Sequence, residues 1–124
     1  MDESLQYVKM CQKAKEIQKL KALRQGDWMS WKGTMNVIII GGRTLDVAGF
    51  QDYIWLPRQD QLQAMLGDFE QQLDILDDWR ERGKEPMPYW NIGNLKSWEQ
   101  LCLAFVMEQK NNKVWNGEDW INAL

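Results

Sequence analysis

Five acidic residues between positions 70 and 81 form the densest set of chemically capable side chains in the sequence. They recur at helical spacing and are Glu70, Asp74, Asp77, Asp78 and Glu81. Carboxylates on one helix face could bind a divalent cation, but calcium and magnesium sites draw their oxygen ligands from loops or from several elements. We therefore interpret the row as a solvated helix face, partly offset by Arg80 and Lys84, and we expect no metal site.

Groups that could act as nucleophiles or bases are few, because the chain has no histidine. That absence removes the usual general base and the commonest metal ligand. Ser30 and Ser97 therefore have no imidazole to activate them. Cys11 and Cys102 lie among apolar neighbours, and burial raises the pKa of a thiol. We interpret them as buried thiols in a reducing compartment rather than a disulfide, and we expect neither enzymatic activity nor a cofactor.

A glycine pair, Gly41-Gly42, follows an apolar stretch and precedes Arg43-Thr44. Such a loop could cradle a phosphate, but it lacks both the Gly-x-x-x-x-Gly-Lys-Ser/Thr pattern and a helix after it. A hairpin turn is the favoured interpretation.

Positive charge is concentrated near the N-terminus, with six cations against one anion between Lys9 and Arg24. Such a segment could follow a nucleic-acid backbone, with nearby aromatic rings stacking on bases. The candidate contacts are Lys9, Lys13, Lys19 and Arg24. The sequence pI of about 5.0 and the lack of a nucleic-acid-binding motif favour a solvated face, or one paired with the acidic segment 60–85. Single-stranded nucleic-acid binding stays open as the alternative function.

Eight tryptophans are a heavy load for 124 residues. Four of them lie near turns or element ends, where Trp often marks an interface, and these are Trp28, Trp31, Trp115 and Trp120. They could instead be core residues that close a small sheet. We favour the core for at least two of the four and treat the rest as a candidate surface for a protein partner.

Residues 3–24 are predicted to form one helix, since apolar side chains recur there at spacings of three and four. These are Tyr7, Met10, Cys11, Ala14, Ile17 and Leu20. Gly26 should end this helix, which either docks on the body or projects from it.

Strands are predicted near 28–31, 35–40, 43–47 and 53–56, where β-branched and aromatic residues alternate with turn residues. Tight turns between consecutive strands favour an antiparallel sheet. Helices are predicted near 58–66 and 68–82, with a break at Gly67, and the stretch 83–95 is predicted to be a loop.

The stretch from Ser97 to Ile121 is predicted to form the central element against which the rest of the chain packs. Ser97 is a candidate N-cap with Gln100 at the capping-box position, and the sequence from Trp98 to Met107 is apolar almost all round. A helix without a polar face must be covered on several sides, so the helix near 98–110 should be central and buried. Asn116-Gly117 then predicts a hairpin.

Together these elements predict an α+β protein in one domain, 1–124. Residues 1–24 would form a basic helix, and 25–124 a compact body in which a small antiparallel sheet packs on the helices. The apolar runs are too short to span a membrane, and the acidic start Met1-Asp2-Glu3 does not look like a signal peptide. We therefore expect no membrane association, and a homo-oligomer stays open.

Three blocks carry a resemblance to a group of small uncharacterised proteins from phages and prophages of Gram-positive bacteria. They are WLPRQDQLQ at 55–63, WEQLCLAFVM at 98–107 and VWNGEDW at 114–120. Met often stands in that group where this chain has Trp98, and an aromatic where it has Cys102. The resemblance implies a location in the bacterial host cytoplasm and assigns no activity. With the tryptophan excess, it favours a non-catalytic interaction protein whose partner is another protein of the phage or host.

Overall fold

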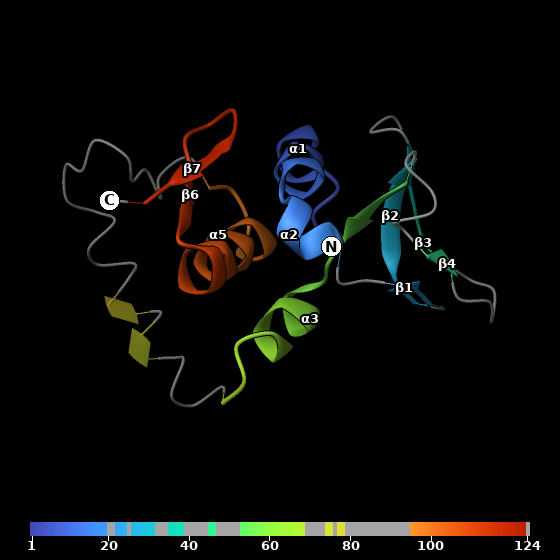
Figure 1. The fold of residues 1–124 in the computed structure, drawn as a ribbon. Coiled ribbons are helices and arrows are strands. Elements are labelled where there is room, and N and C mark those ends of the chain that lie inside the picture. The colour runs from blue at the N-terminus through green and yellow to red at the C-terminus, as the bar shows by residue number, and fades with distance from the viewer. Residues whose placement is uncertain are drawn as a thin grey trace. The chain divides into compact units, whose positions relative to one another are not determined.

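The computed structural model describes residues 1–19, 22–24, 26–31, 35–38, 45–46, 53–68, 74–75, 77–78 and 95–123. Helices and short antiparallel strands make up these residues, so the predicted α+β class is confirmed (Figure 1). The chain divides into two compact units, Met1–Arg58 and Gln59–Leu124, and each is described by itself. The single domain over 1–124 stays a prediction, as does the packing of its sheet on the helices near 58–66, 68–82 and 98–110.

The first unit begins with helix α1, Leu5–Lys13. Its N-cap is Ser4, whose Oγ accepts a hydrogen bond from the backbone N–H of Tyr7 at 3.2 Å. The helix buries Tyr7, Val8, Met10 and Cys11. Because α1 contacts strand β5, Tyr53–Leu56, the N-terminal helix is docked within this unit rather than projecting from it.

The helix predicted over 3–24 is interrupted at Ala14, which adopts φ −82° and ψ 69°. A short helix α2, Lys15–Gln18, follows, and Ala22–Leu23 form strand β1 rather than a helical turn. No glycine or proline stands at the break, so helix propensity gives no signal for it. The physical reason is tertiary, because the Gln18 side chain of α2 hydrogen-bonds the backbone of Trp55.

Three strands form the main sheet of the first unit, in the order β3-β2-β5. Strand β2, Trp28–Trp31, pairs antiparallel with β3, Met35–Ile38, and with β5, so that Met29 lies opposite both Val37 and Trp55. Residues on both faces are buried, Met29 and Trp55 on one and Ser30, Ile54 and Leu56 on the other. Strands β2 and β5 therefore bury side chains on both faces, which fits their apolar sequences.

Strand β4, Leu45–Asp46, was predicted to belong to the same sheet, but it does not. It pairs with β1 in a separate two-stranded sheet, with Ala22 opposite Asp46 and Leu23 opposite Leu45. Residues 39–44 and 47, which complete the predicted strands near 35–40 and 43–47 and contain the predicted Gly41-Gly42 hairpin, lie outside the described residues.

The second unit begins with helix α3, Gln59–Ala64. Gly67 has φ +81°, a left-handed conformation that favours glycine, so the predicted break between the two helices is confirmed there. Residues 74–75 and 77–78 are helical, in agreement with the helix predicted near 68–82. The rest of that helix, and the loop 83–94, lie outside the described residues.

Helix α5, Trp98–Asn111, is the longest described element and contacts α3. Ser97 Oγ accepts a hydrogen bond from the backbone N–H of Gln100 at 3.1 Å, and Gln100 Oε1 accepts one from the backbone N–H of Lys96 at 2.9 Å. The predicted capping pair is thus present, although the glutamine reaches one residue beyond the cap. Every residue from Gln100 to Met107 is buried, as the apolar sequence requires.

A hairpin completes the second unit, with β6, Lys113–Trp115, paired to β7, Trp120–Asn122. Asn112 ends α5 in the left-handed region at φ 54°, and its carbonyl accepts a hydrogen bond from the N–H of Ala123 at 2.8 Å. In the turn, Asn116 Oδ1 accepts from the backbone N–H groups of Glu118 and Asp119, both at 2.8 Å. The hairpin predicted from Asn116-Gly117 therefore forms, as a four-residue turn from 116 to 119.

Candidate functional site

Two of the four candidate partner-surface tryptophans face each other across the hairpin. Trp115 and Trp120 are register partners, with ring centroids 5.1 Å apart and planes tilted by 56°. Their exposed fractions are 8% and 7%. Tilted aromatic pairs at this distance are favourable contacts that stabilise a fold. Both rings belong to the core of the second unit and offer little surface to a partner.

The other two candidates lie at the ends of β2. Trp28 is half-buried, and Trp31 is described by its backbone alone. Positions 28 and 31 are offset by three, an odd number, so they belong to opposite faces of a regular strand. A partner surface that includes both tryptophans stays a prediction.

Trp98 is an exposed tryptophan, among the described side chains, that the sequence argument missed. It was expected to be buried with the rest of the segment 98–107, yet half of its surface is exposed, at 50%. The physical reason is its position as the first residue of α5, directly after the Ser97 cap, where a side chain points back past the end of the helix. The N-cap signal itself could have indicated that this first position escapes burial.

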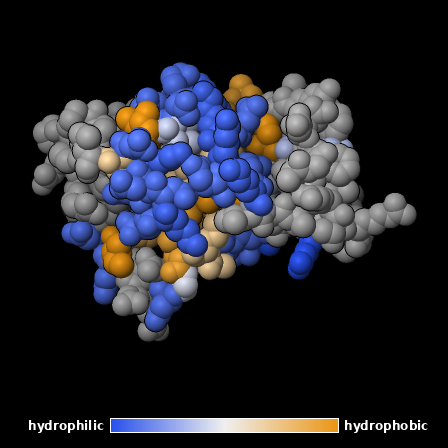
Figure 2. Space-filling view, in the orientation of Figure 1, coloured by the Kyte–Doolittle hydropathy of each residue, from blue (hydrophilic) through white to orange (hydrophobic). Residues whose placement is uncertain are grey.

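Figure 2 shows how apolar side chains are distributed on one face of the described residues. They form separate small spots among polar residues rather than one continuous patch. The described large apolar side chains that are exposed are Met1, Leu5, Ile75, Trp98 and Ile121. Isolated apolar residues are normal on protein surfaces. Without a continuous apolar patch on this face, an interaction site has to be centred on a single large side chain.

The four candidate nucleic-acid contacts do not share one helix. Lys9 and Lys13 are half-buried on α1, whereas Lys19 caps the end of α2 and Arg24 follows β1, both exposed. Lys15 on α2 is exposed as well. The break at Ala14 thus divides the basic segment that the sequence presents as one stripe.

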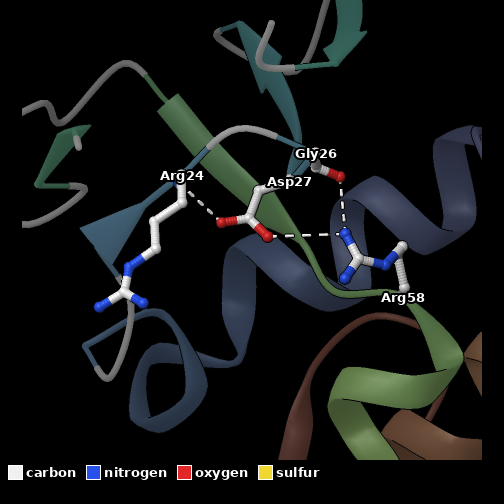
Figure 3. A network of polar contacts seen from close by, with 4 residues as sticks. All are labelled: Arg24, Gly26, Asp27 and Arg58. Atoms are coloured by element: carbon white, nitrogen blue, oxygen red, sulfur yellow. Dashed lines mark hydrogen bonds and ion pairs between the residues drawn. The ribbon is translucent and has the colours of Figure 1, made fainter. Parts of the chain in front are cut away.

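A buried carboxylate, Asp27, holds the turn before β2 (Figure 3). It is 3% exposed, and its Oδ2 accepts a hydrogen bond from the backbone N–H of Arg24 at 2.7 Å. Arg58 donates from Nη1 to the carbonyl of Gly26 at 2.6 Å and lies 3.6 Å from Asp27 Oδ1. Asp27 and Arg58 thereby join positions 31 residues apart. Sequence reasoning missed this pair, because nothing local marks Asp27 as buried.

The cysteine thiols are poorly suited to covalent chemistry. Both are free and buried. Burial raises the pKa of Cys11 far above its ordinary value, and burial together with the nearby Glu99 carboxylate raises the pKa of Cys102 to about 11. Because the thiolate is the reactive form, neither side chain is a nucleophile at neutral pH.

The acidic row does not assemble a site in the part of the chain that the structure describes. Asp74, Asp77 and Asp78 are all exposed, while Glu70 and Glu81 lie outside the described residues. Within the described ranges, no three His, Cys, Asp or Glu side chains come together as a possible metal site. The helices in those same ranges include none with the length and apolar character needed to cross a bilayer.

Comparison with known proteins finds no match to a family model, to a curated protein or to a solved structure. The functional argument therefore depends on the geometry of the described residues.

Replacing Asp27 with asparagine should destabilise the protein by about 1.5–3 kcal/mol. The substitution removes the buried carboxylate charge that accepts the hydrogen bond from the Arg24 N–H and lies beside the Arg58 guanidinium. Urea denaturation measures the change. Asp74→Asn is the matched control, since Asp74 is exposed and its loss of charge should leave the midpoint unchanged. Equal midpoints for Asp27→Asn and the wild type would contradict a structural role for the carboxylate.

The buried thiols should also make stability fall in alkali. Thiols of the unfolded chain ionise near their ordinary pKa of 9.0, whereas folded Cys102 holds its proton to about 11. Between these values the unfolded chain binds fewer protons, so the free energy of unfolding decreases as the pH rises and is unaffected below that window. Urea midpoints of the wild type and of Cys11→Ala/Cys102→Ala should converge there. A constant gap between the two proteins across this pH range would count against buried, protonated thiols.

Proposed function

We propose that this chain is a small non-catalytic protein of phage or prophage type that binds another protein, with Trp98 as the anchor of the contact. The observation that carries the proposal is the 50% exposed fraction of Trp98. Tryptophan is among the residues most enriched at the energetic centres of protein interfaces.

The surroundings of Trp98 suit such an anchor. The ring stands on the first turn of a helix whose next eight residues, 100–107 after Glu99, are buried, so its backbone is held in place. Ser97 fixes that first turn through its hydrogen bond to Gln100. An anchor on a rigid element loses little conformational freedom on binding. Exposed Lys96 and half-buried Glu99 would supply a polar rim of both signs.

The chemistry of the chain supports binding rather than catalysis. It has no histidine, and its two thiols are buried and protonated at neutral pH. The resemblance of the blocks 55–63, 98–107 and 114–120 to phage and prophage proteins adds a cellular setting, the cytoplasm of a bacterial host. The partner in this proposal is a protein of the phage or of that host.

Trp98→Ala should reduce capture of a stoichiometric partner from the lysate of a phage-infected Gram-positive host by at least about tenfold, as expected when an interface anchor is truncated. Quantitative mass spectrometry of immobilised wild type and variant measures the loss. Leu5→Ala is the matched control, because Leu5 is 80% exposed and begins a helix in the other unit. Equal capture by Trp98→Ala and the wild type, or no stoichiometric partner at all, would refute the proposal.

A second candidate function, binding of single-stranded nucleic acid, is favoured by the exposure of Lys15, Lys19 and Arg24 in the first unit. Exposed cations can neutralise phosphates without losing contacts within the fold. The net charge of −3 argues against strong electrostatic attraction to phosphates, so nucleic-acid binding ranks below protein binding.

Under the second candidate, affinity for a single-stranded oligonucleotide should fall steeply as salt rises, and reversing two exposed cations in Lys15→Glu/Lys19→Glu should weaken it further. Fluorescence anisotropy over a salt series measures both effects. Lys110→Glu, at an exposed lysine of α5, is the control and should change the affinity much less. An affinity that does not respond to salt would rule this function out.

A further inference from the structure

The turn that joins β6 to β7 surrounds the side-chain amide of an asparagine with backbone donors (Figure 1). Asn116 Oδ1 accepts hydrogen bonds from the backbone N–H groups of Glu118 and Asp119, both at 2.8 Å. These donors draw electron density from the Asn116 carbonyl, so its Cγ atom is more open to attack by a nucleophile. A pair of backbone N–H groups around a carbonyl oxygen is also the arrangement of an oxyanion hole, which stabilises the negative charge formed during such an attack.

The backbone nitrogen of Gly117 is the nucleophile nearest in the chain to that carbonyl. A bond from this nitrogen to Asn116 Cγ closes a succinimide ring. Gly117 has φ +102°, and no described atom beyond its chain neighbours lies within 4 Å of the place where a Cβ would stand. Among the described residues, no group accepts a hydrogen bond from the Gly117 N–H or from Asn116 Nδ2. The attacking nitrogen and the leaving nitrogen are thus both unhindered in this part of the structure.

The position of the turn gives the reaction its other requirement, access of water. All residues from 116 to 119 are exposed, so solvent can take up the proton of Gly117 and the ammonia that leaves. Asn116 is also the one asparagine in the sequence that glycine follows. At every other asparagine the next residue carries a Cβ, which crowds the attacking nitrogen. Sequence and geometry therefore single out the same residue.

We propose that Asn116 is a self-modifying site, which the folded hairpin converts to aspartate or isoaspartate without an enzyme. Gly117 N gives its proton to hydroxide and bonds to Asn116 Cγ, and the negative charge passes to Oδ1 between the two N–H donors. The Cγ–Nδ2 bond then breaks, Nδ2 takes a proton from water and leaves as ammonia, and the succinimide remains. Water adds to either carbonyl of the ring and opens it to a carboxylate.

The conversion changes the charge and the backbone of the hairpin. The new carboxylate makes the net charge one unit more negative than −3 and stands close in sequence to those of Glu118 and Asp119. Opening to isoaspartate also leads the main chain through the former side chain, which adds a methylene group before Gly117. Because this turn sets Trp115 opposite Trp120, the isoaspartate product disturbs the register of that pair.

The test follows the full chain by peptide mass spectrometry during incubation at mildly alkaline pH. Position 116 should gain the mass difference between an amide and a carboxylic acid, located by fragment ions. Conversion should be at least about fivefold faster in the folded chain than in the same chain unfolded in guanidinium chloride, because only the folded turn aligns the two donors. Asn122 is the control in the same sample, since it is exposed but precedes Ala123, and it should convert far more slowly.

A pair of variants tests the donors themselves. Asp119→Pro removes one of the two N–H groups and should slow conversion of the folded chain towards the rate of the unfolded chain. Asp119→Ala is the matched control, because it removes the carboxylate and keeps the N–H, and it should convert as the wild type does.

Each other result overturns the proposal. Conversion of the folded wild type at the rate of the unfolded chain, or below it, would show that the turn does not promote the reaction. Equal rates in folded Asp119→Pro and Asp119→Ala would show that the donors have no part in it. Cleavage of the chain after position 116 would show that Nδ2 attacks the backbone in place of Gly117 N. If Asp119→Pro does not fold, the comparison of folded with unfolded wild type decides.

Discussion

Strand β5 constrains the first unit, because backbone groups at its end are bonded on both sides, by β2 on one edge and by side chains at Trp55 and Pro57 on the other. A buried N–H or C=O without a partner costs about as much as a lost hydrogen bond or more, so each one has to be supplied with a partner. Strand β2 supplies one edge. The side chains of Gln18 and Tyr7 supply the other, from residues 37 and 50 positions away. The path of the N-terminal segment follows from this requirement, including its break in the middle of a good helical sequence.

Helix α5 plays the corresponding role in the second unit through burial rather than edge closure. Its residues from Gln100 to Met107 leave no solvated face, and the hairpin after it buries Trp115 and Trp120 against each other. The Nε1 atom of Trp115 is buried without a hydrogen-bond partner among the described residues, which costs free energy. A fold that retains such a ring uses its large apolar area to fill the core. The tryptophan excess is therefore explained in part by packing and is not in itself a functional signal.

Local sequence signals predicted most of the elements. Strands 28–31 and 53–56, the cap at Ser97, the break at Gly67 and the hairpin at 116–119 each depend on a few neighbouring residues, and all are present. The break at Ala14, the pairing of β4 with β1 and the burial of Asp27 depend on contacts between distant positions. The hydrophobic periodicity of a segment carries no information about such contacts with distant positions. The proposed anchor, Trp98, was missed for a related reason, since an average over a helix face hides the exposure of its first residue.

The function argued for this chain follows from where the structure leaves large side chains in contact with water. Its catalytic inventory is poor by composition, and burial suppresses the two thiols further. Its basic segment is divided at Ala14, so the described cations are distributed over two helices and the end of a strand rather than one helix. Trp98 differs from both groups, because it is a large apolar ring held at half exposure by a capped and buried helix. Exposing that ring costs the isolated chain hydrophobic free energy, and a partner that covers it would recover this free energy. Covering this ring is the gain on which the proposal of protein binding depends.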